Sequence, residues 1–341
     1  MATGPEEANQ VQSVLHLIEP SGVDVAGRAV GSDCCTLLCG QAMRATPTLA
    51  HRVWVLGGSE ARTRAEWLGL HVQGQVRPLL GMAERSARTL RQQLRQERPA
   101  DVVHAWSEGA WRAARAAETF GLVGTALTMR DDAGAELRLW PGSDEELASI
   151  GSAAPPVRDR TALRNGLQVG QDEVLVALLA ESTVEADARP LLWAMTMLHL
   201  VGVPAVGLVP AQSRFAGAAR TLARGLRCDE MLVEVAEPTV GLLDGADVAV
   251  IPGTVAKEAA RVLALAALAR GVPVAAHRAV APAGAPEDMT YFLRGDTPQD
   301  IAEGVSRLHR GASRTPWRLA RRADGLMRLW NSAIAARMID A

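Results

Sequence analysis

The chain has 341 residues, of which 48% are hydrophobic and 22% charged, and its formal net charge at pH 7 is −2. A chain of this length and apolar content can bury a sizeable core, and it exceeds the usual size of one domain. The near balance of charge excludes an overall field that would hold nucleic acid or an anionic membrane non-specifically. We therefore expect a globular protein of two domains that binds no nucleic acid.

The chain shows no sign of export or membrane insertion. Residues 1–11 lack an apolar segment of the signal-peptide kind, so we expect a polar tail there. The longest apolar run, Val262–Ala269, is too short to cross a bilayer. None of the four cysteines has the spacing of zinc ligands, so we expect reduced thiols and no metal site. We predict a cytoplasmic protein without an integral membrane segment.

Short apolar runs alternate with longer amphipathic stretches from about residue 13 onward, which is typical of βαβ units and a mainly parallel sheet. We assign residues 12–150 to a first Rossmann-like domain. Its expected strands are Ser13–Ile18, Arg52–Leu56, Val72–Val76, Asp101–Ala105 and Gly124–Thr128. Its expected helices include Ser32–Arg44 and Gly81–Glu97.

The alternation stops between Pro141 and Asp159, where proline, glycine, serine and acidic residues gather, and we interpret this stretch as a linker. A second Rossmann-like domain is expected over residues 160–315. Its expected strands are Glu173–Leu179, Ala205–Val209, Glu230–Val235, Asp247–Ile251 and Val272–Ala276. Residues 316–341 are expected to form a last helix, which carries Trp330 and braces one domain against the other. The predicted class is thus α/β with two mainly parallel sheets.

The second half carries three stretches whose order is that of a known enzyme family. They are Gly170–Ala180 with Leu191–Ala194, Asp247–Val274, and Ala283–Glu287 with Gly295–Asp296 and Asp300–Ala302. In the first half, Val14–Pro20 and Pro99–Ser107 agree more loosely. These stretches resemble the retaining, family 4-like glycosyltransferases of the GT-B fold. The resemblance implies two facing Rossmann-like domains, the first on the acceptor side and the second on the donor-nucleotide side, with a nucleotide sugar as substrate and no metal or other cofactor.

The chain departs from this family at its donor site. The resemblance implies an arginine and a lysine that neutralise the leaving diphosphate, but the matching positions hold Glu181 and Ala186. It also implies two glutamates eight positions apart on one helical face, for the donor sugar and the ribose, and these positions hold Glu258 and Ala266. A carboxylate repels a phosphate. The sequence therefore predicts a divergent member with a degraded donor site.

Two residues are candidates for catalysis. His104 ends a strand of the first half, where ligands of open α/β sheets bind, and its ring can orient a hydroxyl. A histidine packed in the core is an equal alternative. Trp106, at the second position of the family's His-x-His pattern, cannot exchange a proton. The resemblance implies that Glu258 contacts the donor sugar. The alternative is that Glu258 only stabilises its helix, because a negative charge is favourable at the positive end of the helix dipole.

The candidates for nucleotide binding are Gly22, Gly27, Arg28, Arg278, Gly284 and Glu287. The first three lie in a glycine-rich loop after the first strand, where backbone amides can cradle an anion and Arg28 is the nearest cation. Arg278 follows the strand Val272–Ala276 at its carboxyl end, and we expect it to substitute for a missing phosphate contact. Gly284 and Glu287 belong to the loop that the resemblance places beside the donor.

Three functions stay open at this point. The first is a glycosyltransferase that moves a sugar from a nucleotide-sugar donor to an acceptor without a metal. The second is an inactive protein of the same fold that binds or scaffolds a protein partner, which Glu181, Ala186 and Ala266 support. The third is a nucleotide-sugar epimerase, which needs acids and histidines that converge in a cleft.

Overall fold

The structure is a computed structural model, and the chain forms two compact units. The described residues are 11–20, 22–23, 29–76, 83–96, 100–117, 122–125, 139–140, 157–180, 186–255, 257–280, 282, 284–317 and 324–339. Unit 1 comprises Met1–Gly151 and Ala320–Ala341, and unit 2 comprises Ser152–Leu319. The expected linker, Pro141–Asp159, lies mostly outside the described residues.

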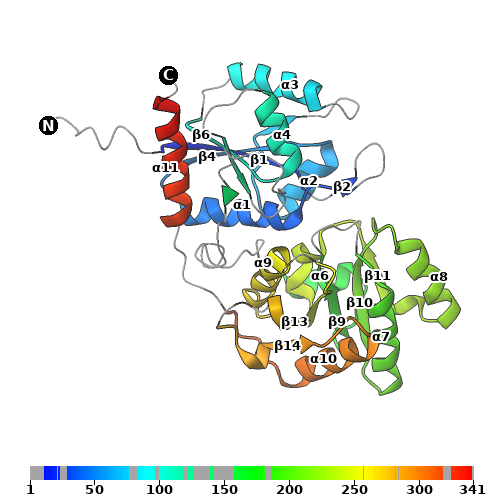
Figure 1. The fold of residues 1–341 in the computed structure, drawn as a ribbon. Helices are drawn as coiled ribbons and strands as arrows, with labels where there is room; N and C mark the ends of the chain where they lie inside the picture. The colour runs from blue at the N-terminus through cyan, green and yellow to red at the C-terminus, as the bar shows by residue number, and fades with distance from the viewer. Residues whose placement is uncertain are drawn as a thin grey trace. The chain divides into compact units, whose positions relative to one another are not determined.

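Unit 1 is built on a sheet of six described strands, all parallel, in the order β5-β4-β1-β6-β7-β8 (Figure 1). The strands are β1 (Ser13–Ile18), β4 (Ala50–Leu56), β5 (Gly74–Val76), β6 (Val102–Ala105), β7 (Leu122–Thr125) and β8 (Leu139–Trp140). Counted within the unit, the order is 3-2-1-4-5-6, which is that of the doubly wound Rossmann fold. A short antiparallel hairpin of β2 (Gly22–Val23) and β3 (Ala29–Val30) follows β1.

Helices cover both faces of this sheet. The helices are α1 (Asp33–Ala45), α2 (Ser59–Trp67), α3 (Ala83–Gln96), α4 (Glu108–Ala116) and α11 (Asp324–Ile339). Leu90 of α3 and Trp111 of α4 pack with Leu15 and Leu17 of β1, so these helices cover one face. Figure 1 shows α1 on the opposite face. Ser32 begins α1 because its side chain accepts a hydrogen bond from the N–H of Cys35.

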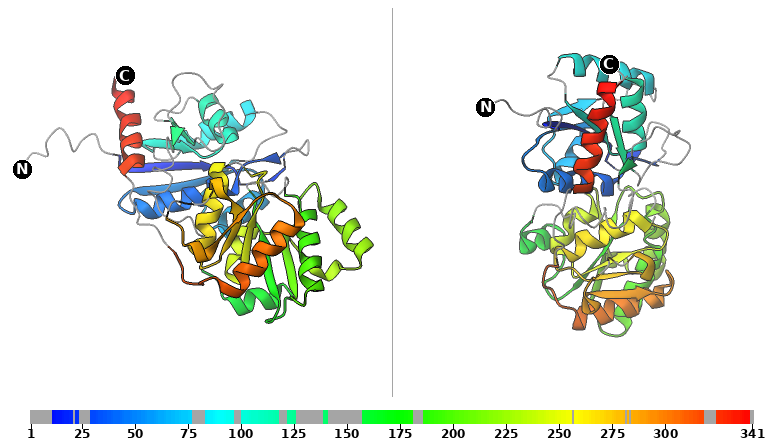
Figure 2. Two further views of the ribbon diagram at one scale, coloured as in Figure 1. Left: turned by 60° about the horizontal axis from the view of Figure 1, so that its bottom comes forward. Right: turned by 60° about the vertical axis from the view of Figure 1, so that its left-hand side comes forward.

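The C-terminal helix α11 belongs to unit 1, although it follows unit 2 in the chain (Figure 2). Its Trp330 is fully buried, and the indole Nε1 donates to Nδ1 of His104 on β6 at 3.2 Å. Just before the amino end of β1, the N–H of Val11 donates to Oδ1 of Asn331 in α11 at 3.1 Å. These contacts fix α11 to unit 1, and the expected bracing of one domain against the other stays a prediction.

Unit 2 repeats the same architecture. Its six described strands are parallel, in the order β11-β10-β9-β12-β13-β14. They are β9 (Val174–Leu178), β10 (Ala205–Pro210), β11 (Leu232–Val235), β12 (Val248–Ile251), β13 (Val274–His277) and β14 (Thr290–Leu293). The α-helices are α6 (Arg160–Gly166), α7 (Arg189–Leu200), α8 (Ala216–Leu226), α9 (Lys257–Leu268) and α10 (Pro298–Gly311). Two mainly parallel sheets confirm the expected α/β class.

The core of unit 2 lies between its sheet and three helices. Side chains of α7, α8 and α10 pack against β9, β12 and the neighbouring strands, while Figure 1 shows α6 and α9 on the other face. Thr297 begins α10, since its side chain accepts from the N–H of Asp300, and Pro298 occupies the first turn. Within the described part of the chain, no helix is both long and apolar enough to span a membrane.

Candidate functional site

Unit 2 contains a pocket of about 540 Å³ at the carboxyl ends of β12 and β13. Its lining includes the turn after β12, the first residue of α9, and His277 at the end of β13. Ligands of doubly wound sheets bind at the carboxyl ends of the strands, and the N-terminus of a helix favours an anion there. The volume is within the usual range for small-molecule sites. This pocket is therefore the candidate functional site.

His277 and Asp296 form a hydrogen-bonded pair in the pocket. Nε2 of His277 lies 3.3 Å from Oδ1 of Asp296, and the N–H of Gly253 donates to both carboxylate oxygens at 3.0 Å. A carboxylate can only accept, so the proton of the imidazole is on Nε2. Each of the two side chains is 32% exposed. Hydrogen bonds thus hold Nε2 of His277 and the carboxylate of Asp296 in place, while part of each side chain stays open to solvent.

Gly253 allows this pair to form. A Cβ atom on Gly253 would lie 2.5 Å from Nε2 and 2.7 Å from Cδ2 of His277, closer than any real contact of this kind. The ring edge that carries Nε2 therefore packs against the bare backbone of the turn after β12. A side chain at this position would push the imidazole away from Asp296.

The third polar side chain of interest in the pocket is that of Lys257, the first residue of α9 and the single lysine of the sequence. It follows the turn that contains Gly253 and Thr254, which also line the pocket. The lining thus combines one cation, one carboxylate and one imidazole. Such a mixture suits a ligand that carries both negative charge and hydroxyl groups.

The structure does not bring Arg278 into this pocket. Its guanidinium lies over the ring of Phe292, 5.8 Å from the centroid, which is the geometry of a cation–π contact. Gly284, with a φ of +77°, and the exposed Glu287 lie on the connection between β13 and β14 and are not lining residues. Their roles in nucleotide binding stay predictions.

The other donor-site positions are only partly described. Glu258 lies in the first turn of α9, but its side chain is outside the described residues, as is all of Glu181. Ala266 is fully buried on α9, and Ala186 is 3% exposed. The carbonyl oxygen of Ala186 accepts a hydrogen bond from the hydroxyl of Ser213. Both alanines are parts of the packed interior, so neither presents a surface to a ligand.

In the first half, Gly22 lies on the β2–β3 hairpin, paired with Val30, whereas Gly27 and Arg28 are outside the described residues. His104 is fully buried on β6. Its Nδ1 accepts from Trp330, and burial lowers the pKa of the imidazole to about 3. These contacts fit the alternative of a packed histidine, and the catalytic role of His104 stays a prediction.

His104 is part of a largely buried cluster of histidines and tryptophans that periodicity in the sequence does not predict. We call His16, His51, His104, Trp106 and Trp330 the histidine–tryptophan cluster. The three histidines lie on β1, β4 and β6, which are adjacent in the sheet, and His16 is in register with His104. The rings of His104 and Trp106 stack with centroids 3.9 Å apart. The sequence carries one signal of this cluster: two of the predicted strands contain a histidine, and a third directly follows one. The strand order then makes these histidines neighbours.

The hydrogen bonds of this cluster run in one direction. Trp106 Nε1 donates to Nδ1 of His16 at 3.0 Å, because an indole only donates. His16 Nε2 then donates to Nδ1 of His51 at 3.0 Å, and His51 Nε2 donates to the carbonyl oxygen of Thr46 at 2.9 Å. Burial and the neighbouring imidazoles hold the pKa of His16 well below its usual value, and burial lowers that of His51. All three rings are therefore neutral at pH 7.

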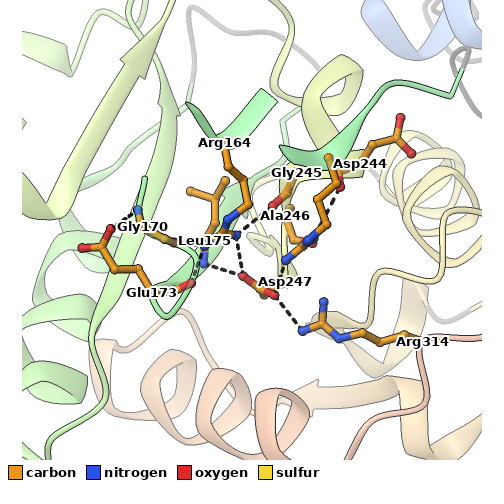
Figure 3. Close-up of polar contacts among 10 residues, drawn as sticks. Arg164, Gly170, Glu173, Leu175, Asp244, Gly245, Ala246, Asp247 and Arg314 are labelled. Carbon is orange, nitrogen blue, oxygen red and sulfur yellow. Dashed lines mark hydrogen bonds and ion pairs between the residues drawn. The ribbon is translucent and has the colours of Figure 1, made fainter. Parts of the chain in front are cut away.

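A second polar cluster lies at the amino end of β12, opposite the pocket (Figure 3). The carboxylate of Asp247 accepts from Arg160 and Arg314 on Oδ1, each at 2.7 Å. On Oδ2 it accepts from Arg164 at 3.0 Å and from the N–H of Leu175 at 2.8 Å. Burial alone would raise the pKa of Asp247, but the hydrogen bond from Leu175 and the charges of Arg160 and Arg314 lower it.

This arginine–aspartate cluster joins distant parts of unit 2. Arg164 has no exposed surface, and it also donates to the carbonyl oxygens of Gly245 and Glu173. The cluster thereby ties α6 and the segment that contains Arg314 to the amino ends of the central strands β9 and β12. Both carboxylate oxygens of Asp247 are occupied by protein contacts, so we assign the cluster to stability. Among the described residues, no group of three or more histidines, cysteines or acids is placed to hold a metal ion.

No protein-family model matches the sequence, and no curated protein matches it. Solved structures share the fold. MnaA of S. aureus, solved with UDP, has a TM-score of 0.54 at 10% identity, over 96% of both chains. A family 9 glycosyltransferase of Veillonella parvula gives 0.53 at 8% identity, over 88% of this chain and 99% of that one. WaaG, a glycosyltransferase involved in lipopolysaccharide biosynthesis, gives 0.53 at 12% identity, over 96% and 95%. The chain has a GT-B glycosyltransferase-like fold.

Proposed function

We propose that the protein is a glycosyltransferase of the retaining, family 4-like kind, which transfers a sugar from a nucleotide-sugar donor to an acceptor in the cytoplasm. The observation that carries this proposal is the position of the unit 2 pocket, at the carboxyl ends of β12 and β13 and beside the first residue of α9. MnaA, which has the same fold, was solved with UDP, and this supports a nucleotide as the ligand. The nucleotide sugar is the substrate, and we propose no separate cofactor.

Lys257 is the residue that we expect to contact the diphosphate. The positive end of the α9 dipole adds to its charge, and both favour an anion in the pocket. A charge-assisted hydrogen bond contributes about 1.5–3 kcal/mol. Replacing Lys257 with alanine should therefore weaken nucleotide binding by roughly ten- to a hundredfold, whereas Lys257→Arg should keep most of the affinity.

Calorimetric titration with UDP, GDP, ADP and their common sugar conjugates tests this proposal. We expect micromolar affinity for one nucleotide, reduced in Lys257→Ala. A matched control is Arg220→Ala, which removes an exposed cation of α8 that pairs with Glu234, outside the pocket. If the unaltered protein binds none of these ligands at concentrations up to millimolar, the transferase proposal is ruled out.

A second candidate function is an inactive protein of this fold that binds a protein partner. Two observations favour it. Ala186 and Ala266 occupy positions where the family has polar contacts to the donor, and both are buried in the interior. The epimerase alternative has less support, since His277 lines the pocket whereas His104 is buried in the other unit. If no nucleotide or nucleotide sugar binds, the result favours the inactive protein that binds a protein partner, and that partner would then be sought.

A further inference from the structure

We propose that His277, in its protonated form, binds a phosphate of the nucleotide sugar, and that Asp296 is the positioning residue that stabilises this cation. The inference rests on the proposed function. It names a residue that supplies positive charge to the pocket of a chain that has Glu181 and Ala186 at the positions of the family's phosphate-binding cations. Three observations lead to it, from the hydrogen bonds, the packing and the charges of the pocket.

The hydrogen bonds leave one nitrogen of the ring available. Nε2 of His277 is engaged by Asp296, whose carboxylate is itself held by the N–H of Gly253. Across the described ranges, Nδ1 of His277 has no hydrogen-bond partner, and the side chain lines the pocket with 32% of its surface exposed. Since the Nε2 edge packs against the turn at Gly253, Nδ1 is the nitrogen left for a ligand.

The state of Nδ1 decides what it can bind. In the neutral ring, Nε2 carries the proton, so Nδ1 presents a lone pair that repels a phosphate oxygen. In the protonated ring, Nδ1 donates a charge-assisted hydrogen bond to the same oxygen. The carboxylate of Asp296 lies at hydrogen-bond distance from Nε2 and provides the counter-charge of the protonated ring. Binding of a phosphate and binding of a proton are therefore coupled.

The remaining charges of the pocket agree with this arrangement. Lys257 comes from α9 and Asp296 from the connection between β14 and α10, and these two are the other titratable groups among its described lining residues. With a neutral imidazole, the charges of Lys257 and Asp296 cancel. With His277 protonated, the lining has a net charge of about +1. A positively charged lining attracts the two phosphates of a nucleotide sugar, whereas a lining of zero net charge does not.

Calorimetric titration in buffers of different ionisation enthalpy tests the coupling. The probe is the nucleotide sugar that binds most tightly in the panel, because its two phosphate groups do not titrate between pH 6 and pH 8, so any proton taken up belongs to the protein. We expect proton uptake on binding at pH 7.5. A single coupled proton changes Kd at most tenfold per pH unit, and we expect Kd to rise about tenfold from pH 6 to pH 8.

Two variants and one control separate the residues. His277→Gln cannot be protonated, so its Kd should be independent of pH and its proton uptake should be lost. Asp296→Asn keeps a hydrogen-bond acceptor for Nε2 without the charge, and we expect affinity at pH 7.5 to fall about tenfold with a smaller uptake. His199→Gln changes an exposed histidine of α7 outside the pocket and should leave both quantities unchanged.

Nitrogen NMR of the labelled histidines gives a readout that does not depend on affinity. We expect the proton of His277 on Nε2 in the free protein, and on both nitrogens in the complex. If a nucleotide sugar binds with dependence on Lys257 while His277→Gln retains the proton uptake, the inference is overturned and the proposed function stands. If no nucleotide binds the unaltered protein, the proposed function fails, and the inference fails with it.

Discussion

Replacing Asp247 with alanine is expected to lower the free energy of unfolding of unit 2 by about 3–5 kcal/mol. The variant leaves the buried guanidinium of Arg164 without its counter-charge and removes the acceptor for the N–H of Leu175. Removing one partner of a buried ion pair costs more than the pair itself contributes, because an uncompensated charge stays in the interior. Since the whole stability of a domain is about 5–15 kcal/mol, the variant should be marginal.

Urea unfolding followed by circular dichroism measures this loss, and hydrogen exchange of the β9 and β12 amides assigns it to unit 2. The matched control is Asp187→Ala, which removes a carboxylate whose partner, Arg189, is 44% exposed. An exposed pair contributes little, and the hydrogen bond from the N–H of Arg189 at the start of α7 contributes about 1 kcal/mol, so the urea midpoint should move far less than in Asp247→Ala. An unchanged midpoint in Asp247→Ala would show that the arginine–aspartate cluster does not stabilise the unit.

Acid is expected to destabilise unit 1 from about pH 6.5 downward, well before carboxylates titrate. The pKa of His104 is lowered from 6.5 to about 3 by burial, and that of His16 is also lowered, so the folded state binds fewer protons than the unfolded state in this range. Stability is therefore fully present above pH 6.5, falls as the pH decreases, and levels off only below the folded pKa. Each such histidine contributes a slope of about 1.4 kcal/mol per pH unit.

The pKa of Asp247 is lowered from 3.8, so its contribution is lost only at more acidic pH, as the pH falls through the folded value. Between pH 6.5 and pH 4 the histidines are thus the cause. Urea unfolding at pH 7, 6, 5 and 4, with hydrogen exchange of the β1 and β6 amides to assign the transition to unit 1, measures the slope.

His104→Gln tests the assignment, because glutamine keeps an acceptor for the indole of Trp330 and takes up no proton. We expect the slope to decrease by about 1.4 kcal/mol per pH unit. His309→Gln, at an exposed position of α10, is the control and should leave the slope unchanged. An equal slope in His104→Gln and in the unaltered protein would mean that other groups bind the protons.

Periodicity in the sequence predicts the central strands of both sheets, since these are long apolar runs between turn signals. It misses β8 (Leu139–Trp140) and β14 (Thr290–Leu293), which are short strands at sheet edges. In β14 the exposed Phe292 sits between buried residues, so the alternation of burial does not match an alternation of polarity. The expected strand from Glu230 begins at Leu232, because Asp229–Met231 forms a 3-10 turn.

The candidate site is predicted only in outline. That His277 follows a strand is visible in the sequence, and strand ends are where ligands bind. Its partner Asp296 lies on the connection after the next strand, so only the paired register of β13 and β14 brings the two together. The same limit applies to Arg278, since its distance along the chain from Phe292 says nothing about the contact between them. Lateral neighbours in a parallel sheet depend on strand order, which periodicity does not encode.

Unit 1 is discontinuous in sequence, because Ala320–Ala341 completes it after the whole of unit 2. During synthesis, domains generally fold as units and the N-terminal one folds first. Here the ribosome makes the entire second unit before it makes Trp330, whose indole fills the interior of the first and caps His104. The nascent first unit therefore lacks Trp330 and the rest of α11 until the second unit has been made. Loss of the segment that carries Trp330 would therefore damage the unit that is made first.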